Sequence, residues 1–331
     1  MLPKSEFISI SDNLNLVTTF LQEVIISPKK TLTAWAKITN QTPAAKIGYV
    51  GQHLASLITG VKGTGTGARG DDLADGTEVK SCNKIDQVDK CKDCGERVLR
   101  IEDICSSCGS KNIDRKDDSK WLFTIRDEHE LNQYLQMDRV FLLLLDYPKF
   151  DLDDFNDIRI SAFEIYPKEQ RMSVFCDLIK NHYYNIFLPK LENNQKTNPM
   201  NLHPWSFQFY KCNPIKTFEC IIESIDSNPT INIISYITPN IERNTSMASL
   251  LMPSSLLKDD EWLHLANSVS YNTELVPLML DVCKCPPTFE EWKLLSKKEK
   301  SDLIPFIPEG LRKYIPLRPI VSNRQKKHYQ R

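Results

Sequence analysis

The sequence predicts an α/β protein built on a mixed β-sheet that is covered by helices. Two apolar segments, 139–147 and 157–166, have the length and composition of strands buried in a sheet. Segments with apolar residues at helical spacing lie before and after them, as is typical of a sheet packed between helices. With 331 residues, 41% of them apolar, the chain is long enough for one large or two ordinary domains.

The expected elements follow from the apolar spacing and from capping residues. Helical patterns are expected at 12–27, beginning at Asp12, and at 43–60, ending at Gly60. A later helix at 127–135 has Asp127 as its expected N-cap. The other expected elements are strands at 120–125, 139–147, 157–166, 207–211 and 230–238, and helices at 171–187, 249–282 and 289–303.

The polar segment 191–201 is expected to be a linker or a long loop. It divides the chain into a catalytic-type α/β domain at 1–195 and a smaller α+β portion at 196–331. The first part contains a cysteine-rich insert at about 86–116.

The charge distribution indicates a polyanionic partner, although the formal net charge is only −1. No acid occurs between Glu23 and Asp71, and none occurs in the basic segment 311–331. Such segments are typical of nucleic-acid contacts, and a solvated basic tail is the alternative for the second. The chain shows neither a signal peptide nor an apolar run long enough to cross a membrane, so a cytoplasmic protein is expected.

The segment GARGDDLADGTEVKSC, residues 67–82, predicts a hairpin that gathers acids beside a lysine. Asp75-Gly76 is a favoured pair for a two-residue hairpin loop. Counting outward from that loop pairs Asp71 with Lys80 and places Asp71, Glu78 and Lys80 on one face, with Asp72 on the other. A solvated, acid-rich turn is the alternative interpretation.

Two close carboxylates beside a lysine suit phosphodiester hydrolysis. Mg²⁺ is held by one or two carboxylates, keeps several waters and binds phosphate oxygens. A bound Mg²⁺ lowers the pKa of its water and stabilises charge on the phosphate. Lys80 beside it could orient or deprotonate that water, or neutralise the phosphate. The expected catalytic set is therefore Asp71, Glu78 and Lys80, with Mg²⁺ held by the two acids.

The pattern Asp71, six residues, then Glu78-Val79-Lys80 resembles that of the PD-(D/E)xK nuclease superfamily, most closely MutH and related type II restriction endonucleases. Upstream, KIGYVGQHL at 46–54 is similar to the helix motif of that family. The resemblance covers 46–81 and implies a restriction-endonuclease-like fold, metal binding by Asp71 and Glu78, and a catalytic role for Lys80.

The resemblance also has one departure. The family usually places a glutamate on the upstream helix near the metals, and Ala55 occupies the matching position here. Gln52 and His53 are the candidates for a substitute role.

The insert predicts a structural zinc site. Cys91 and Cys94 form one CxxC pair, and Cys105 and Cys108 form a second pair ten residues later. This spacing is typical of a closed tetrahedral Zn²⁺ site, and a glycine after each pair eases the tight turn. Such a zinc ribbon could staple a long loop or present basic residues to DNA, and the sequence does not separate these roles. The basic residues concerned are Lys92, Arg97 and Arg100.

The remaining cysteines and the histidines carry no ligand pattern. Cys82, Cys176, Cys212 and Cys220 are expected as buried thiols, and the pair Cys283 and Cys285 has no second half. The four histidines expected to be packing or surface residues are His129, His182, His203 and His264.

These observations predict a Mg²⁺-dependent type II restriction endonuclease that cleaves double-stranded DNA. Such enzymes commonly act as homodimers on palindromic sites, so a dimer is expected. The rival from another class is a non-catalytic DNA-binding zinc protein, and the rival within the enzymes is a MutH-like repair nickase. Residues 196–331 are the expected DNA-recognition portion.

Overall fold

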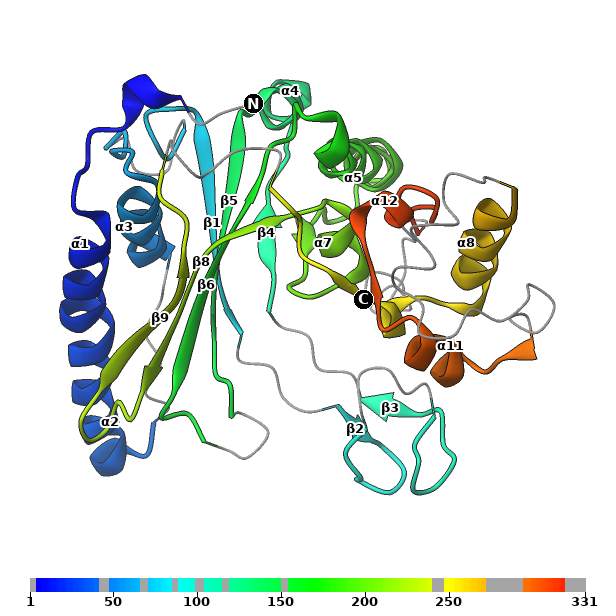
Figure 1. The fold of residues 1–331 in the computed structure, drawn as a ribbon, viewed down its shortest axis with the longest axis horizontal. Coiled ribbons are helices and arrows are strands. Elements are labelled where there is room, and N and C mark those ends of the chain that lie inside the picture. The colour runs from blue at the N-terminus through cyan, green and yellow to red at the C-terminus, as the bar shows by residue number, and fades with distance from the viewer. Residues whose placement is uncertain are drawn as a thin grey trace.

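A five-stranded mixed sheet forms the centre of the molecule (Figure 1). The computed structural model describes residues 4–41, 48–65, 71–84, 89–98, 104–114, 119–149, 154–239, 247–271 and 294–318. The strand order is β1-β5-β6-β8-β9, in which the β1–β5 pair is parallel and the other pairs are antiparallel. The strands are β1 (Thr77–Lys84), β5 (Arg139–Asp146), β6 (Ile158–Ile165), β8 (Ile215–Glu223) and β9 (Thr230–Tyr236).

Strand β5 lies inside the protein because its residues 140–145 are apolar on both faces. All eight of its residues are buried, as expected for a continuous apolar run in a sheet covered on both sides. The sequence predictions for β5 and β6 are confirmed. By contrast, β8 was not predicted, because its apolar residues are interrupted by Lys216 and Glu219, which form an ion pair at 2.6 Å.

One face of the sheet is covered by the N-terminal helices. A single helical segment comprises α1 (Asn13–Phe20), a π-helical stretch η2 (Leu21–Ile26) and α2 (Ser27–Thr39), and α3 (Gly48–Thr59) lies between α1 and the sheet. The helix predicted at 12–27 therefore extends twelve residues further. Pro28 follows directly after the π-helical stretch, and the helix continues through it. Gly60 ends α3 with a positive φ of 73°, as predicted.

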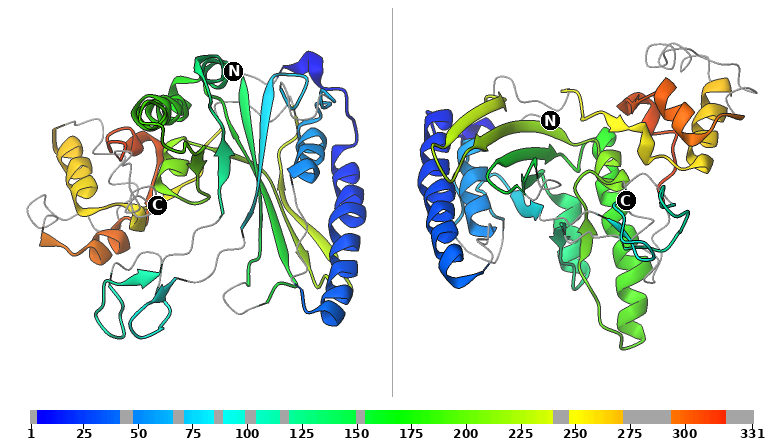
Figure 2. Two further views of the ribbon diagram at one scale, coloured as in Figure 1. Left: turned by 180° about the vertical axis from the view of Figure 1, so that it is seen from behind. Right: turned by 90° about the horizontal axis from the view of Figure 1, so that it is seen from below.

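The opposite face is covered by helices from the middle of the chain (Figure 2). They are α4 (Glu128–Gln136), η4 (Gln170–Met172), α5 (Val174–His182), η5 (Tyr183–Phe187), α6 (Leu188–Glu192) and α7 (Phe207–Lys211). Asp127 caps α4 as predicted, since its Oδ1 accepts from the N–H of Glu130 at 2.8 Å. The strand predicted at 207–211 is wrong. This segment is the helix α7, because the side chain of Ser206 caps its N-terminus.

Three two-stranded sheets accompany the central sheet. Strand β4 (Trp121–Phe123) pairs with β7 (Met200–Leu202), and β2 (Lys90–Cys91) pairs with β3 (Ile113–Asp114) in the cysteine insert. The third sheet pairs β10 (Met252–Pro253) with β11 (Phe306–Ile307). The remaining elements are η1 (Ser5–Phe7), η6 (Ser254–Leu256), α8 (Asp259–Tyr271), α11 (Lys297–Leu303) and α12 (Glu309–Arg312).

The predicted boundary near residue 195 does not coincide with an end of the central sheet. Strands β8 and β9, from the predicted second portion, complete the sheet begun by β1, β5 and β6. The later residues share the same apolar core, in which Trp262 and Leu311 are fully buried. The chain therefore forms one α/β core, to which 247–271 and 294–318 add a smaller set of helices and short strands.

Several sequence predictions lie outside the described residues. They concern Lys46, Arg100, the pair Cys283 and Cys285, the basic tail from 319 onward and parts of the helices predicted at 249–282 and 289–303. Among the predicted thiols, Cys82, Cys212 and Cys220 are buried and Cys176 is half-buried. No helix within the described part of the chain is long and apolar enough to span a membrane.

Candidate active site

Strand β1 carries the predicted catalytic residues at one edge of the sheet. Along a strand, side chains alternate between the two faces. Val79 is buried in the apolar core under α3, whereas Cys82 belongs to the core on the opposite face. Glu78 and Lys80 therefore lie on the side of Cys82.

Glu78 and Lys80 form a partly buried ion pair. The ammonium group of Lys80 donates a short hydrogen bond to Glu78 Oε1. Only 13% of the Glu78 side chain and 24% of the Lys80 side chain are exposed to solvent. Both side chains are therefore mostly packed against the protein, with a small part of each exposed at the sheet edge.

Two aromatic residues from other elements surround the Lys80 ammonium. Its Nζ lies 5.9 Å from the ring centre of Phe123 in β4, and Tyr134 of α4 packs edge-on against the same ring at 5.8 Å. Burial lowers the pKa of Lys80, but Glu78, Tyr134 and Asp72 raise it by more, so the net shift is upward. Lys80 is therefore a cation at neutral pH.

The predicted two-residue hairpin loop is wrong. Gly76 has a positive φ of 82°, but Asp75 is not in the left-handed region that a two-residue loop of this type requires. Instead, the N–H of Gly76 donates to the carbonyl of Leu73 at 3.1 Å, and the N–H of Leu73 donates to the carbonyl of Thr77 at 3.2 Å. The loop therefore has three residues, 74–76. Leu73 lies opposite Thr77 rather than opposite Glu78 as predicted.

This shift changes which aspartate approaches β1. Asp72 was predicted to lie on the face opposite Glu78 and Lys80, and its Oδ2 accepts from the N–H of Val79 at 2.8 Å. Its Oδ1 accepts from the Gln52 side chain at 2.5 Å. Asp71, by contrast, is exposed. The structure thus brings Asp72 to the strand that holds Glu78 and Lys80.

Asp72 is electrostatically coupled to the acid–lysine pair. Its pKa is raised to about 6, chiefly by burial, with a further increase from Glu78 and Asp71. The hydrogen bond from Val79 and the charge of Lys80 oppose this shift. Half-buried acids that repel one another in this way form a suitable set of oxygen donors for a divalent cation.

Helix α3 approaches β1 closely enough to place Gln52 in this group. A Cβ atom at Gly51 would overlap the Oγ of Ser81 and lie 2.7 Å from its Cβ, so only glycine permits this approach. Of the two substitutes proposed for the missing helix glutamate, Gln52 reaches Asp72, whereas His53 stacks against Phe20 at 5.8 Å. Ala55 is fully buried.

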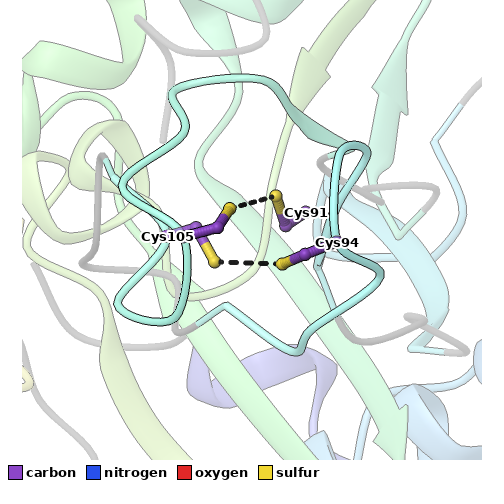
Figure 3. A group of neighbouring side chains, drawn as sticks. Cys91, Cys94 and Cys105 are labelled. Carbon is purple, nitrogen blue, oxygen red and sulfur yellow. Dashed lines mark hydrogen bonds between the residues drawn. The ribbon is translucent and has the colours of Figure 1, made fainter.

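The four cysteines of the insert come together as predicted (Figure 3). Their sulfurs lie within 4.8 Å of one another, and the closest contacts are Cys91 to Cys108 at 3.5 Å and Cys94 to Cys105 at 3.6 Å. Ligands about 2.3 Å from a tetrahedral zinc ion are about 3.8 Å apart, which matches this spacing.

The local backbone also suits thiolate ligands. The N–H groups of Gly95 and Gly109 donate to the carbonyls of Cys91 and Cys105 at 2.9 and 2.8 Å, and both glycines have a positive φ. The pKa of the Cys91 thiol is lowered to about 7, chiefly by a hydrogen bond from the backbone N–H of Cys94. The neighbouring sulfurs raise the pKa values of the Cys94 and Cys108 thiols, so the turn N–H groups favour the sulfur anion most clearly at Cys91.

Sequence reasoning missed the residues that support the site from a distance. Phe123 and Tyr134 lie more than forty positions after Lys80, and no spacing signal connects them with it. Two predicted packing histidines are confirmed, since His182 Nε2 and His203 Nδ1 each lie 3.1 Å from a backbone carbonyl oxygen.

Comparison with known proteins assigns the chain to the restriction endonucleases. The model of the MamI restriction endonuclease family matches residues 34–255. The chain belongs to this family. The type II restriction enzyme MamI of Microbacterium ammoniaphilum is 35% identical over 138 residues, which are 42% of this chain and 39% of that enzyme. The chain thus spans well under two thirds of this relative's length. No solved structure matches the chain.

Proposed function

We propose that the protein is a Mg²⁺-dependent type II restriction endonuclease that hydrolyses phosphodiester bonds at a specific sequence in double-stranded DNA. The observation that carries this proposal is the acid–lysine edge, which we define as Asp71, Asp72, Glu78 and Lys80. Membership of a restriction endonuclease family and the 35% identity to a type II restriction enzyme support it. The PD-(D/E)xK resemblance stays a prediction.

Mg²⁺ would be held at this edge by Glu78 together with an aspartate. Asp71 is the partner that the motif spacing indicates, and Asp72 is the partner that contacts β1. When bound, Mg²⁺ would supply an activated water and neutralise charge on the phosphate.

Lys80 is assigned the role of a fixed cation. Because its pKa is raised, its ammonium group stays protonated and is suited to stabilise the extra negative charge that develops on the phosphate. Phe123 lies against its ammonium group and Tyr134 packs on the Phe123 ring, which helps to fix the charge beside Glu78. Removal of this charge should affect the chemical step more than DNA binding.

The direct test is cleavage of plasmid DNA in the presence of Mg²⁺. We expect discrete fragments from the wild-type protein and a loss of at least about 100-fold in rate for Glu78→Gln and for Lys80→Met, with DNA binding preserved. Glu223→Gln and Lys216→Met on β8 are matched controls and should cleave normally. A wild-type protein that binds DNA but never cuts it would favour the non-catalytic zinc protein, and nicking alone would favour a repair enzyme.

Asp71→Asn and Asp72→Asn identify the metal-binding aspartate. The variant that removes a ligand should require a higher Mg²⁺ concentration for half-maximal cleavage, while the other should keep the wild-type requirement. Equal Mg²⁺ requirements for both variants and the wild type would exclude both aspartates as ligands.

We further propose that the four cysteines hold one structural Zn²⁺ and that the protein acts as a homodimer. Four thiolates fill a tetrahedral site and leave no position for a substrate, so this zinc would stabilise the insert and take no part in hydrolysis.

A dimer would match the two-fold symmetry of a palindromic site, with 196–331 supplying contacts to the bases. Analytical ultracentrifugation with and without DNA tests the dimer.

A further inference from the structure

A buried polar network lies directly behind the loop of the acid–lysine edge. At its centre is Arg139, the first residue of β5, which is paired in register with Thr77, the first residue of β1. Arg139 is only 2% exposed. Its Nε donates to Thr77 Oγ1 at 2.8 Å, and its Nη2 donates to Asp75 Oδ2 at 2.5 Å.

Asp75 connects this network to the loop itself. Its second oxygen, Oδ1, accepts from the hydroxyl of Thr77 at 2.6 Å and from the N–H of Thr77 at 3.2 Å. Asp75 is 5% exposed, although Asp71 and Ala74 in the same acid-rich segment are exposed. The loop that separates Asp72 from Glu78 is therefore held from inside the protein.

The network continues across the sheet through Glu164 of β6. Glu164 is fully buried, and its Oε2 lies 3.5 Å from Arg139 Nη1. The same carboxylate accepts from Tyr166 Oη at 2.5 Å and from Thr217 Oγ1 of β8 at 3.2 Å. Strands β5, β6 and β8 thus all contribute to fixing one loop.

The composition of the network indicates that it fixes the conformation of the loop rather than adding to the stability of the protein. Two buried carboxylates, those of Asp75 and Glu164, face one buried guanidinium group. Buried ion pairs are commonly no more stabilising than apolar residues of the same size, because the charges lose their hydration. What they provide is a defined geometry, since an alternative loop conformation would leave buried charges without partners.

We propose that Asp75 and Arg139 are positioning residues for the acid–lysine edge. They hold the loop so that Asp72 stays on the N–H of Val79 and next to Glu78, which keeps the candidate metal ligands together. This inference rests on the proposed function for its catalytic consequence, and the loop geometry can be tested without that function.

The test compares Asp75→Asn with Glu261→Gln. Asparagine keeps the size of Asp75 and its bonds to Thr77 but removes the charge that faces Arg139. Glu261 forms an equally buried ion pair with Arg318, at 2.6 Å, in the C-terminal part of the chain. Both variants lose one buried ion pair, so a general loss of stability affects both alike.

The first measurement is hydrogen–deuterium exchange of the peptide 71–80 in the metal-free protein. We expect at least tenfold faster exchange of the Val79 amide in Asp75→Asn and wild-type exchange in Glu261→Gln. The second measurement is cleavage, in which Asp75→Asn should need at least tenfold more Mg²⁺ for half-maximal rate, with unchanged DNA binding in the absence of metal.

Unchanged exchange in Asp75→Asn, or equally faster exchange in Glu261→Gln, would overturn the positioning role. Should Asp75→Asn fail to fold, Tyr166→Phe removes only one hydrogen bond to Glu164, and its Val79 amide should exchange faster than that of Glu261→Gln. Absence of cleavage by the wild-type protein would refute the proposed function alone, because the exchange measurement does not depend on activity.

Discussion

Asp72 shows how a single carboxyl group can make the stability of the protein depend on pH. In the folded protein its pKa is about 6, compared with an ordinary value of 3.8, so the folded state binds the proton more tightly than the unfolded chain. Stability should therefore decline as the pH rises from about 4 to about 6 and stay lower above that range.

Asp72→Asn should remove this decline. The asparagine Oδ1 can accept from Val79, and its amide can donate to Gln52 once the Gln52 amide rotates. Each unit of pKa shift corresponds to about 1.4 kcal/mol, and solvent screening of this half-buried group reduces the expected gain at pH 8 to about 1 kcal/mol. The measurement is urea unfolding of the metal-free protein at several pH values.

Asp71→Asn is the matched comparison, because Asp71 is exposed and lacks the contact with Val79. Asp71→Asn should keep the decline between pH 4 and 6, slightly reduced because Asp71 makes a small contribution to the raised pKa of Asp72. An Asp72→Asn variant whose stability still falls between pH 4 and 6 would contradict the assignment.

At the scale of elements, the contact between α3 and β1 depends on Gly51. Alanine at this position would overlap Ser81, and relief requires a shift of the helix or strand. We expect Gly51→Ala to lower the free energy of unfolding by about 1–3 kcal/mol, the usual cost of overpacking. Chemical denaturation measures this change.

Gly48 at the start of α3 is the matched control. A Cβ atom there would contact nothing within 4 Å, and the residue does not have a positive φ. Gly48→Ala should stabilise the protein by about 0.5–1 kcal/mol through the helix propensity of alanine. Equal effects of the two substitutions would show that the close approach of α3 is unimportant.

The cysteine insert offers a second prediction at this scale. The described insert has a small apolar core, formed by Cys91, Val98, Cys105 and Ile113, so we expect a bound metal to supply much of its stability. The purified protein should contain about one zinc per chain by elemental analysis. Cys91→Ser should lose that zinc, while Cys176→Ser, which alters a half-buried thiol elsewhere, should keep it. A zinc-free protein whose insert resists proteolysis would contradict this prediction.

Most of the elements could be predicted from local sequence patterns, and the failures have physical causes. The apolar run of β5 and the cap of α4 are local signals that the structure confirms. Residues 207–211 have the composition of a strand, but the Ser206 cap and tertiary packing make them helical. In the candidate site, Glu78 and Lys80 share a face as predicted, whereas the position of Asp72 depends on one extra loop residue. Contacts from Arg139, Phe123 and Tyr134 require the folded sheet and have no local signal.

At the scale of the whole molecule, the sheet makes the two halves of the chain interdependent. Residues 1–195 alone would lack β8 and β9, so β6 would lose one of its two partner strands and the apolar cover supplied by Phe218 and Ile222. A protein truncated after residue 195 should show no cooperative unfolding transition, whereas one that ends at Arg318 should retain it. Circular dichroism during thermal unfolding distinguishes these outcomes. A cooperative 1–195 fragment would restore the two-domain division.

The C-terminal part is attached to the core by buried basic residues. Arg312 donates to Tyr210 and Ile307 carbonyls at 2.9 and 3.0 Å, and Lys211 donates to the Ile315 carbonyl at 2.5 Å. Arg318 also stacks over the ring of Phe207 at 4.0 Å. These contacts make the helices after 247 a fixed extension of the sheet rather than a separately hinged unit.

The pairing of Lys90 with Asp114 has an evolutionary consequence. Since these two residues are paired across β2 and β3, the two ends of the cysteine-bearing insert lie next to each other. The distance between those two ends does not depend on how many residues lie between them. Related proteins are therefore free to enlarge, shrink or exchange this insert without rearranging the rest of the fold or the candidate active site on β1.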